Sequence, residues 1–199
     1  MKLLLRCTAA LLAMGLIGLH PAMAQSGFDR LDLHVAGSLP LSLAGTEDWR
    51  QDWAGQVTAR TPFYEGFLET GLHGQGWSPN QGATGLNGQP LPWWVSVYAF
   101  VGAHVEGRMG PRTDLAGGVR MGNYFMVFDT DAVAGQRRES EFAVAPVVRL
   151  QVRLWQDWRV VAEAMWIRTF TMNRMDAVQA SVGLSLPVDM PTWLGRVLE

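Results

Sequence analysis

The sequence predicts an all-β protein, an eight-stranded antiparallel up-and-down transmembrane β-barrel. Three observations predict it: apolar residues alternate with polar or small ones along most of the 199-residue chain, the alternating segments are long, and aromatic residues gather near the segment ends. Period two is the period of a β-strand, whose successive side chains point to opposite faces. Segments of about 13 residues exceed the usual soluble strand and suit a tilted strand across a bilayer, which needs about 9–11 residues.

A secretory signal peptide is predicted at the N-terminus. Lys2 and Arg6 give a positively charged start, residues 8–19 form a short apolar core, and Ala-Met-Ala precedes the predicted cleavage site after Ala24. The apolar core is too short for a spanning helix, so export is predicted rather than an anchor. The chain then divides into a signal peptide at 1–24, a barrel at 25–188 and a periplasmic C-terminal tail at 189–199.

Composition excludes several classes of protein. Cys7, inside the predicted signal peptide, is the only cysteine, so the exported chain has no disulfide. Lys2 is the only lysine, and the arginines that remain are outnumbered by 18 acidic residues, so there is no basic field for nucleic acid. After the signal peptide no apolar run is long enough for a spanning helix. A membrane could therefore be crossed only by a closed barrel, in which every backbone group is paired.

In each of the first four predicted strands, every second residue is mostly apolar and the residues between are mostly polar or small. We call these two sets the apolar parity and the polar parity of the strand. In 28–43, Leu and Val alternate with Arg, Asp and His, and in 49–61, Trp, Val and Ala alternate with Gln, Thr and Arg. In 67–74, Leu and Thr oppose Glu and His. In 92–106, one parity is Trp, Val and Ala, whereas the other holds Trp94, Ser, Tyr, Gly, His and Glu.

The last four predicted strands repeat the pattern. In 113–128, Leu, Val and Met alternate with Ala, Gly, Arg and Tyr. The segment 142–154 is apolar at every second position, with Ala, Val, Gln and Arg between, and the chain turns at Gln156–Asp157. It returns through 158–166, where Trp, Val and Ala oppose Arg, Glu and Met. In 177–188, Val, Ala and Leu oppose Gln, Ser and Gly.

The connections between these strands alternate in length. Those near residues 45, 80 and 134 are the longer ones, and those near 64, 109 and 157 are mostly shorter. Long extracellular loops and short periplasmic turns give this pattern in outer-membrane barrels. We expect the 75–91 and 129–140 loops to face outward.

The polar parity is predicted to line the lumen. It is poor in charge and rich in Gly, Ala and Ser, whereas a water-facing surface would be dense in charged residues. Because an isolated buried ion costs several kcal/mol, the few charges are expected to pair and to plug the barrel. The predicted lumen ionic network is Arg60, Glu69, Glu106, Arg120, Arg149, Arg153 and Glu163.

Aromatic residues near the strand ends are predicted to lie at the two membrane interfaces, where amphipathic rings are favoured. The predicted interface aromatics are Trp53, Trp93, Trp94, Tyr64, Trp155 and Trp158. Trp49 and Trp77 are assigned to the same outer rim.

Over residues 28–188 the pattern resembles the eight-stranded outer-membrane barrels, such as the transmembrane domain of outer membrane protein A and its small relatives. The resemblance implies a place in the outer membrane, with membrane lipid and the barrel-assembly machinery as partners. The chain departs from the family in one respect. Its last strand ends in Gly-Leu-Ser-Leu-Pro-Val at 183–188 without the usual terminal aromatic, and eleven residues follow. A variant assembly signal is therefore implied.

The sequence contains little chemistry that indicates an enzyme. His34, His73 and His104 lie on the polar parity, and Ser96 is about 26 Å from His104 along one strand at about 3.3 Å per residue. We find no cofactor motif and no metal-site spacing, and expect a non-enzymatic envelope protein. Three alternatives remain open: a small pore, a lipid-modifying enzyme, and a soluble periplasmic lipocalin-like binder. The sequence identifies no ligand and no extracellular or periplasmic protein partner of this chain.

Overall fold

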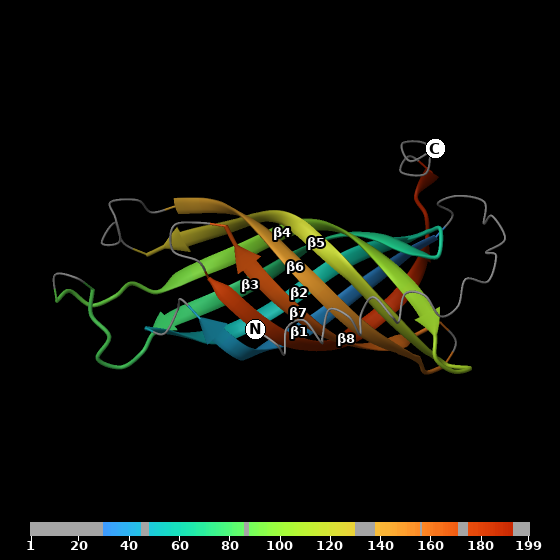
Figure 1. Cartoon of the computed structure of the whole chain (residues 1–199), viewed down its shortest axis with the longest axis horizontal. Helices are drawn as coiled ribbons and strands as arrows, with labels where there is room; N and C mark the ends of the chain where they lie inside the picture. Colours follow the sequence, from blue (N-terminus) through green and yellow to red (C-terminus); the bar gives the residue numbers. More distant parts are fainter. Residues whose placement is uncertain are drawn as a thin grey trace, which may run out of the picture.

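The eight strands form a closed barrel in which each strand pairs antiparallel with its neighbours in sequence, and β8 closes onto β1 (Figure 1). The computed structural model describes residues 30–44, 48–85, 88–129, 138–155, 157–170 and 175–192. The strands are β1 (Arg30–Ala44), β2 (Trp49–Phe63), β3 (Gly66–Pro79), β4 (Trp94–Arg108), β5 (Thr113–Phe128), β6 (Arg138–Arg153), β7 (Arg159–Thr169) and β8 (Asp176–Asp189). The predicted fold class is confirmed. Among the described residues, no helix is both long and apolar enough to cross a membrane.

Several predicted features lie outside the described residues. These are the signal peptide at 1–24, the first residues of the barrel at 25–29, most of the 129–140 loop, and the tail from 193 onward.

The polar parity of the predicted strands faces the barrel interior and the apolar parity faces out, except at the start of β2. In β6, for example, Val147, Arg149 and Gln151 are buried, whereas Val148 and Leu150 are exposed. The outer surface is therefore a belt of Leu, Val, Met and aromatic side chains. On β4 the belt runs from Val95 to Val105, roughly 33 Å along the strand and about 25 Å in height once the strand tilts by about 40°.

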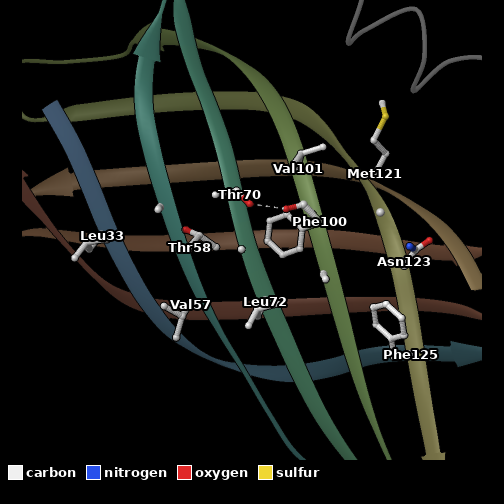
Figure 2. A pocket seen from close by; sticks show the side chains of 14 residues that line it. Leu33, Val57, Thr58, Thr70, Leu72, Phe100, Val101, Met121, Asn123 and Phe125 are labelled. Atoms are coloured by element: carbon white, nitrogen blue, oxygen red, sulfur yellow. Dashed lines mark hydrogen bonds between the residues drawn. The ribbon is translucent and has the colours of Figure 1, made fainter. Parts of the chain in front are cut away.

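Among the described residues, two hollows with volumes of about 560 and 1010 Å³ open on this outer belt. The larger is mostly apolar, but its lining includes Glu69 and His104. The smaller crosses β1 to β5 and includes Leu33, Val57 and Leu72 (Figure 2). Thr70 at its floor donates a hydrogen bond to the carbonyl of Phe100 at 3.1 Å. The hydroxyl is therefore satisfied on a surface that is mostly apolar, with Asn123 as another polar side chain in the lining.

Strand β3 is longer than its composition predicts. The 75–91 segment is rich in Gly, Gln and Asn and was expected to be a loop, but β3 continues to Pro79, which pairs with Trp49. Strand β2 supplies the backbone partners, and the indole of Trp53 covers Gly74 and Gly76 on the outer face. The connection to β4 therefore begins only at residue 80.

A β-bulge in β2 changes which side chains face inward near its start. The register with β3 shifts between Gln51 and Trp53, so that Trp49 packs against the interior cluster and donates to the carbonyl of Pro92 at 3.0 Å. The outer-rim expectation for Trp49 is wrong because a bulge reverses the parity of the residues that precede it.

The barrel has two different ends. At the end we call the loop end lie the connections β1–β2, β3–β4, β5–β6 and β7–β8, with the green 80–93 segment at the left of Figure 1. At the other, the turn end, lie the connections at 64–65, 109–112 and 154–158. The β1–β2 connection at 45–48 is no longer than the last two of these, so the greater length predicted for it is wrong. Because β1 begins and β8 finishes at the turn end, both ends of the barrel sequence lie there.

Candidate functional site

A layer of four ionised side chains crosses the lumen. We call it the ionic layer: Glu69 on β3, Arg120 on β5, Arg149 on β6 and Glu163 on β7, all buried. Arg120 binds both carboxylates in bidentate fashion, at 2.9 and 3.0 Å to Glu69 and at 2.7 and 2.8 Å to Glu163. Arg149 Nη2 bridges the same two carboxylates at 2.7 and 2.6 Å. Two positive and two negative groups thus balance, with the geometry that charge-assisted pairs need.

Neutral side chains extend the layer to the neighbouring strands. Gln56 on β2 donates to Glu163 at 2.9 Å and to Ser181 on β8 at 3.2 Å, and accepts from Arg120 at 3.1 Å. His104 Nε2 on β4 lies 2.7 Å from Glu69 Oε2. Together with the ionic layer, these contacts connect β2 through β8 across the barrel.

Aromatic rings cover the charged groups of the layer. The guanidinium of Arg120 lies 4.5 Å from the centroid of Phe100. The ring of Phe67 stacks on that of His104, with centroids 4.5 Å apart. The same Phe67 centroid lies 5.4 Å from Cζ of the Arg149 guanidinium. These cation–π contacts supply attraction where water is excluded.

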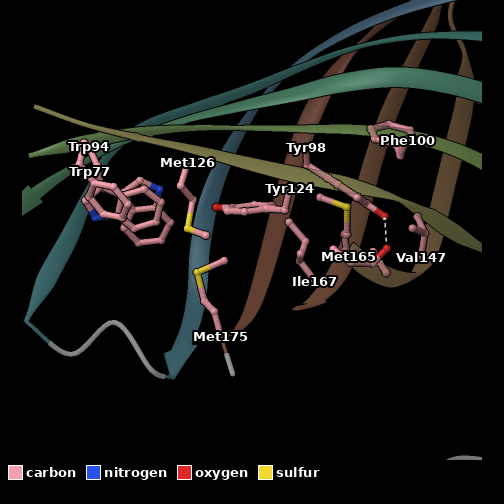
Figure 3. Close-up of a cluster of buried hydrophobic side chains, with 13 residues drawn as sticks. Trp77, Trp94, Tyr98, Phe100, Tyr124, Met126, Val147, Met165, Ile167 and Met175 are labelled. Atoms are coloured by element: carbon pink, nitrogen blue, oxygen red, sulfur yellow. Dashed lines mark hydrogen bonds between the residues drawn. The ribbon is translucent and has the colours of Figure 1, made fainter. Parts of the chain in front are cut away.

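An aromatic cluster fills the loop-end half of the interior. The indole rings of Trp77 and Trp94 are stacked, with centroids 4.9 Å apart and planes only 4° apart (Figure 3). The ring of Phe128 lies 5.8 Å from that of Trp94. The cluster comprises Trp77, Trp94, Tyr98, Phe100, Tyr124, Met126, Phe128, Ala143, Ala145, Val147, Met165, Ile167 and Met175. Two packed layers of different chemistry therefore follow one another along the barrel axis.

A hydrogen-bonded group sits inside the cluster. Ser96 is 2.7 Å from the hydroxyl of Tyr124, accepts from Trp77 Nε1 at 3.2 Å, and donates to Gln75 at 3.1 Å. Gln75 also accepts from Tyr124 and is 3.3 Å from His73 Nδ1. Ser96 and His73 are thus joined only through an amide, and both are buried. This group resembles a structural network rather than an activated nucleophile, which needs direct contact with its base.

Three arginines converge on one carboxylate at the turn end. Asp32 accepts from Arg30 Nε at 2.9 Å and from Arg159 Nη1 at 3.0 Å. Arg60 Nη2 lies 3.7 Å from the same carboxylate and donates to Ser185 at 3.0 Å. We call this group the arginine vestibule.

The seven residues predicted to form the lumen network have different positions. Glu69, Arg120, Arg149 and Glu163 meet in the ionic layer, and Arg60 is buried in the arginine vestibule. Glu106 is half-buried and accepts from Gln151 at 2.7 Å. Arg153 is exposed, so the prediction for it is wrong: its parity points inward, but it is the last residue of β6, where the lumen ends.

Five of the six aromatics predicted for the interfaces are exposed: Trp53, Trp93, Tyr64, Trp155 and Trp158. Trp94 is only 3% exposed and lies in the aromatic cluster, so the rim assignment is wrong for it, as it is for Trp77. Trp94 shares its parity with the buried Ser96 and Tyr98, and this signal was already present in the sequence.

The residues missed as site members are Gln56, Gln75, Arg30, Asp32 and Arg159. Alternation puts each of them on the polar parity and makes Arg30 and Asp32 neighbours on one face of a strand, but it does not show which residues meet across strands. Within the part of the chain that the structure describes, no three His, Cys, Asp or Glu side chains group closely enough to hold a metal ion.

No protein-family model and no curated protein matches the chain. Among solved structures, Neisserial surface protein A superimposes with a TM-score of 0.55 at 8% identity, over 82% of this chain and 97% of that one. The attachment invasion locus protein Ail of Yersinia pestis superimposes with a TM-score of 0.48 at 14% identity, over 82% of this chain and 100% of that one. The outer membrane protein OprG of Pseudomonas aeruginosa superimposes with a TM-score of 0.44 at 13% identity, over 81% of this chain and 97% of that one.

These structures are small eight-stranded outer-membrane barrels. At such low identity the likeness to Neisserial surface protein A concerns the fold alone. At that level the resemblance predicted from the sequence is confirmed.

Proposed function

We propose that this chain is an exported, non-enzymatic protein that spans the bacterial outer membrane, anchors and presents its extracellular loops, and has a plugged lumen. The observation that supports this most is the inverted distribution of polarity. Charged side chains such as Arg120 and Glu163 are buried, whereas Leu39, Val101 and Val182 are all more than half exposed. A belt of this size and apolarity would be an aggregation site in water and is the stable surface in a bilayer.

The same distribution disfavours the lipocalin-like alternative. A soluble barrel that binds an apolar ligand needs an apolar cavity inside and a polar surface outside. Here the centre of the barrel is occupied by the ionic layer, and the apolar hollow that includes Leu33, Val57 and Leu72 lies on the outside.

The pore alternative requires an open path, and two packed layers oppose it. An ion crossing the barrel would have to separate the Arg–Glu pairs of the ionic layer and then displace the stacked Trp77 and Trp94. Each of these steps exposes groups that have lost their partners in a low-dielectric interior. We therefore expect no steady conductance.

The orientation follows from export. A chain that enters from the periplasm and whose barrel begins and ends at the turn end leaves the loop end outside. In this arrangement the 80–93 loop is extracellular, Trp53 and Trp93 lie at the outer interface, and Tyr64, Trp155 and Trp158 lie at the inner one. Membrane lipid and the barrel-assembly machinery are the partners that this function requires.

The test is membrane fractionation with gels of boiled and unboiled protein, followed by planar-bilayer recording. We expect the protein in the outer-membrane fraction, a band that shifts on heating, and no single-channel steps, with an open porin as the positive control. A periplasmic protein without a heat shift would contradict the membrane assignment. Regular single-channel steps would contradict the plug and leave the barrel assignment intact.

A further inference from the structure

The arginine vestibule contains more cationic groups than its acids neutralise. Arg30, Arg60 and Arg159 share the carboxylate of Asp32. Among the described residues, Asp32 is the only carboxylate within 4.0 Å of any of these three guanidiniums. Glu69 and Glu106 act on Arg60 only at longer range. In direct contacts three guanidiniums therefore share one carboxylate, which leaves the vestibule with an excess of positive charge.

The vestibule also contains donors that have no acceptor. Arg60 Nε and Arg30 Nη2 are both buried atoms with no hydrogen-bond partner, and the side chain of Arg60 is only 2% exposed. A buried donor left without an acceptor costs about 1–3 kcal/mol, and more when it is charged. Two such donors on arginines that share the carboxylate of Asp32 indicate that an acceptor belongs in this place.

The vestibule is reachable from solvent at the turn end. The side chain of Arg30 is 41% exposed, and those of Arg159 and Asp32 are 15% and 14% exposed. The three arginines come from β1, β2 and β7, so their guanidiniums approach from different walls of the barrel. Arg30 and Arg159 therefore offer guanidinium groups to solvent at the turn end, and Arg60 lies deeper.

We propose that the arginine vestibule is a binding site for an oxyanion of the phosphate class. Water could satisfy the spare donors but would leave the excess charge uncompensated. A phosphate group supplies both the negative charge and several acceptor oxygens, and guanidinium groups match its geometry. The group is either a free phosphate or the head group of an anionic phospholipid, since the two share this chemistry.

The test uses the folded, purified full-length barrel in phosphate-free detergent. Inorganic phosphate is added at constant ionic strength, balanced with chloride, and the midpoint of the heat-induced band shift is measured. We expect a saturable rise of roughly 3–5 °C when phosphate is about tenfold above its dissociation constant. In Arg159→Gln at least tenfold more phosphate should be needed for the same rise. Arg30→Gln, altered at a more exposed position, is the second variant if Arg159→Gln does not fold.

Arg112→Gln is the matched control, because Arg112 is exposed at the same end but lies outside the vestibule. It should respond to phosphate as the unaltered chain does. In a second arm, micelles containing phosphatidic acid replace free phosphate. A rise with phosphatidic acid alone assigns the site to a lipid head group, and a rise with inorganic phosphate shows that the free anion suffices. The proposal is overturned if neither raises the midpoint, if chloride raises it equally, or if Arg159→Gln and Arg30→Gln keep the full response.

Discussion

At the scale of single residues, the stability of the interior depends on charge balance more than on the number of ion pairs. Glu163 accepts hydrogen bonds from Arg120, Arg149 and Gln56 and is almost completely buried. A buried ion pair recovers little more than its own desolvation cost, but removal of one partner leaves an uncompensated charge, at about 3–5 kcal/mol. Neutralising one member of the ionic layer should therefore cost more than neutralising a matched pair.

We expect Glu163→Gln to lower the free energy of unfolding by about 3–5 kcal/mol, since two arginines would then share one carboxylate. The double variant Glu163→Gln with Arg149→Gln restores the balance and should lose less than the sum of the two single losses. Urea unfolding in phospholipid vesicles measures both quantities. Glu65→Gln, in the exposed β2–β3 turn, is the control and should change little. Strictly additive losses would show that the layer is not coupled.

At the scale of the strand, alternation alone predicted which face each residue occupies. It assigned Arg120, Arg149 and Glu163 to the interior and Val101 and Val148 to the outside, because period two is fixed by backbone geometry. Alternation gave wrong predictions where a bulge or the pairing with a neighbouring strand also determines the backbone. The bulge at Gln51–Trp53 depends on local backbone geometry that side-chain pattern does not encode, and the end of β3 depends on pairing with β2. Trp94 was misplaced because a preference of tryptophan for interfaces was given more weight than its parity.

The adjacent residues Trp93 and Trp94 test this point. Trp94 is stacked on Trp77 inside the barrel, and Trp93 is half exposed outside. Trp94→Ala should leave an interior cavity and lower the free energy of unfolding by about 3–5 kcal/mol. Trp93→Ala removes only a surface ring and should cost clearly less. Thermal or urea unfolding of the two variants in the same vesicles makes the comparison, and equal losses would mean that the two rings have similar surroundings.

At the scale of the whole molecule, the ionic layer exists only because the barrel closes. Of the Arg–Glu pairs in the layer, only Arg149–Glu163 joins neighbouring strands. Arg149 on β6 reaches Glu69 on β3, and Arg120 on β5 reaches Glu163 on β7, so these pairs join strands that are not adjacent. Their meeting depends on strand tilt and stagger, which set the heights of residues around the barrel. A single sequence does not contain these quantities. For this reason the lumen residues could be predicted as a set, but the partners on strands that are not adjacent could not.

If the closed barrel spans the outer membrane, its belt contacts lipid, and its two ends contact water on opposite sides of the membrane. Cys7 is the only cysteine and lies in the predicted signal peptide, so single cysteines can be introduced on a silent background. Gln81→Cys lies in the loop-end connection, Met109→Cys at the turn end, and Val101→Cys on the apolar belt, and all three positions are exposed.

With a membrane-impermeant maleimide on intact cells, we expect Gln81→Cys to react at once and Met109→Cys to react only after the outer membrane is permeabilised. Val101→Cys should stay unreactive until the protein is unfolded, because lipid rather than water covers it. The unaltered chain is the control, and reaction there would mean that Cys7 is retained. Reaction of Met109→Cys but not Gln81→Cys on intact cells would reverse the orientation. Prompt reaction of Val101→Cys in the native membrane would show that water reaches the belt, and would return the soluble barrel to consideration.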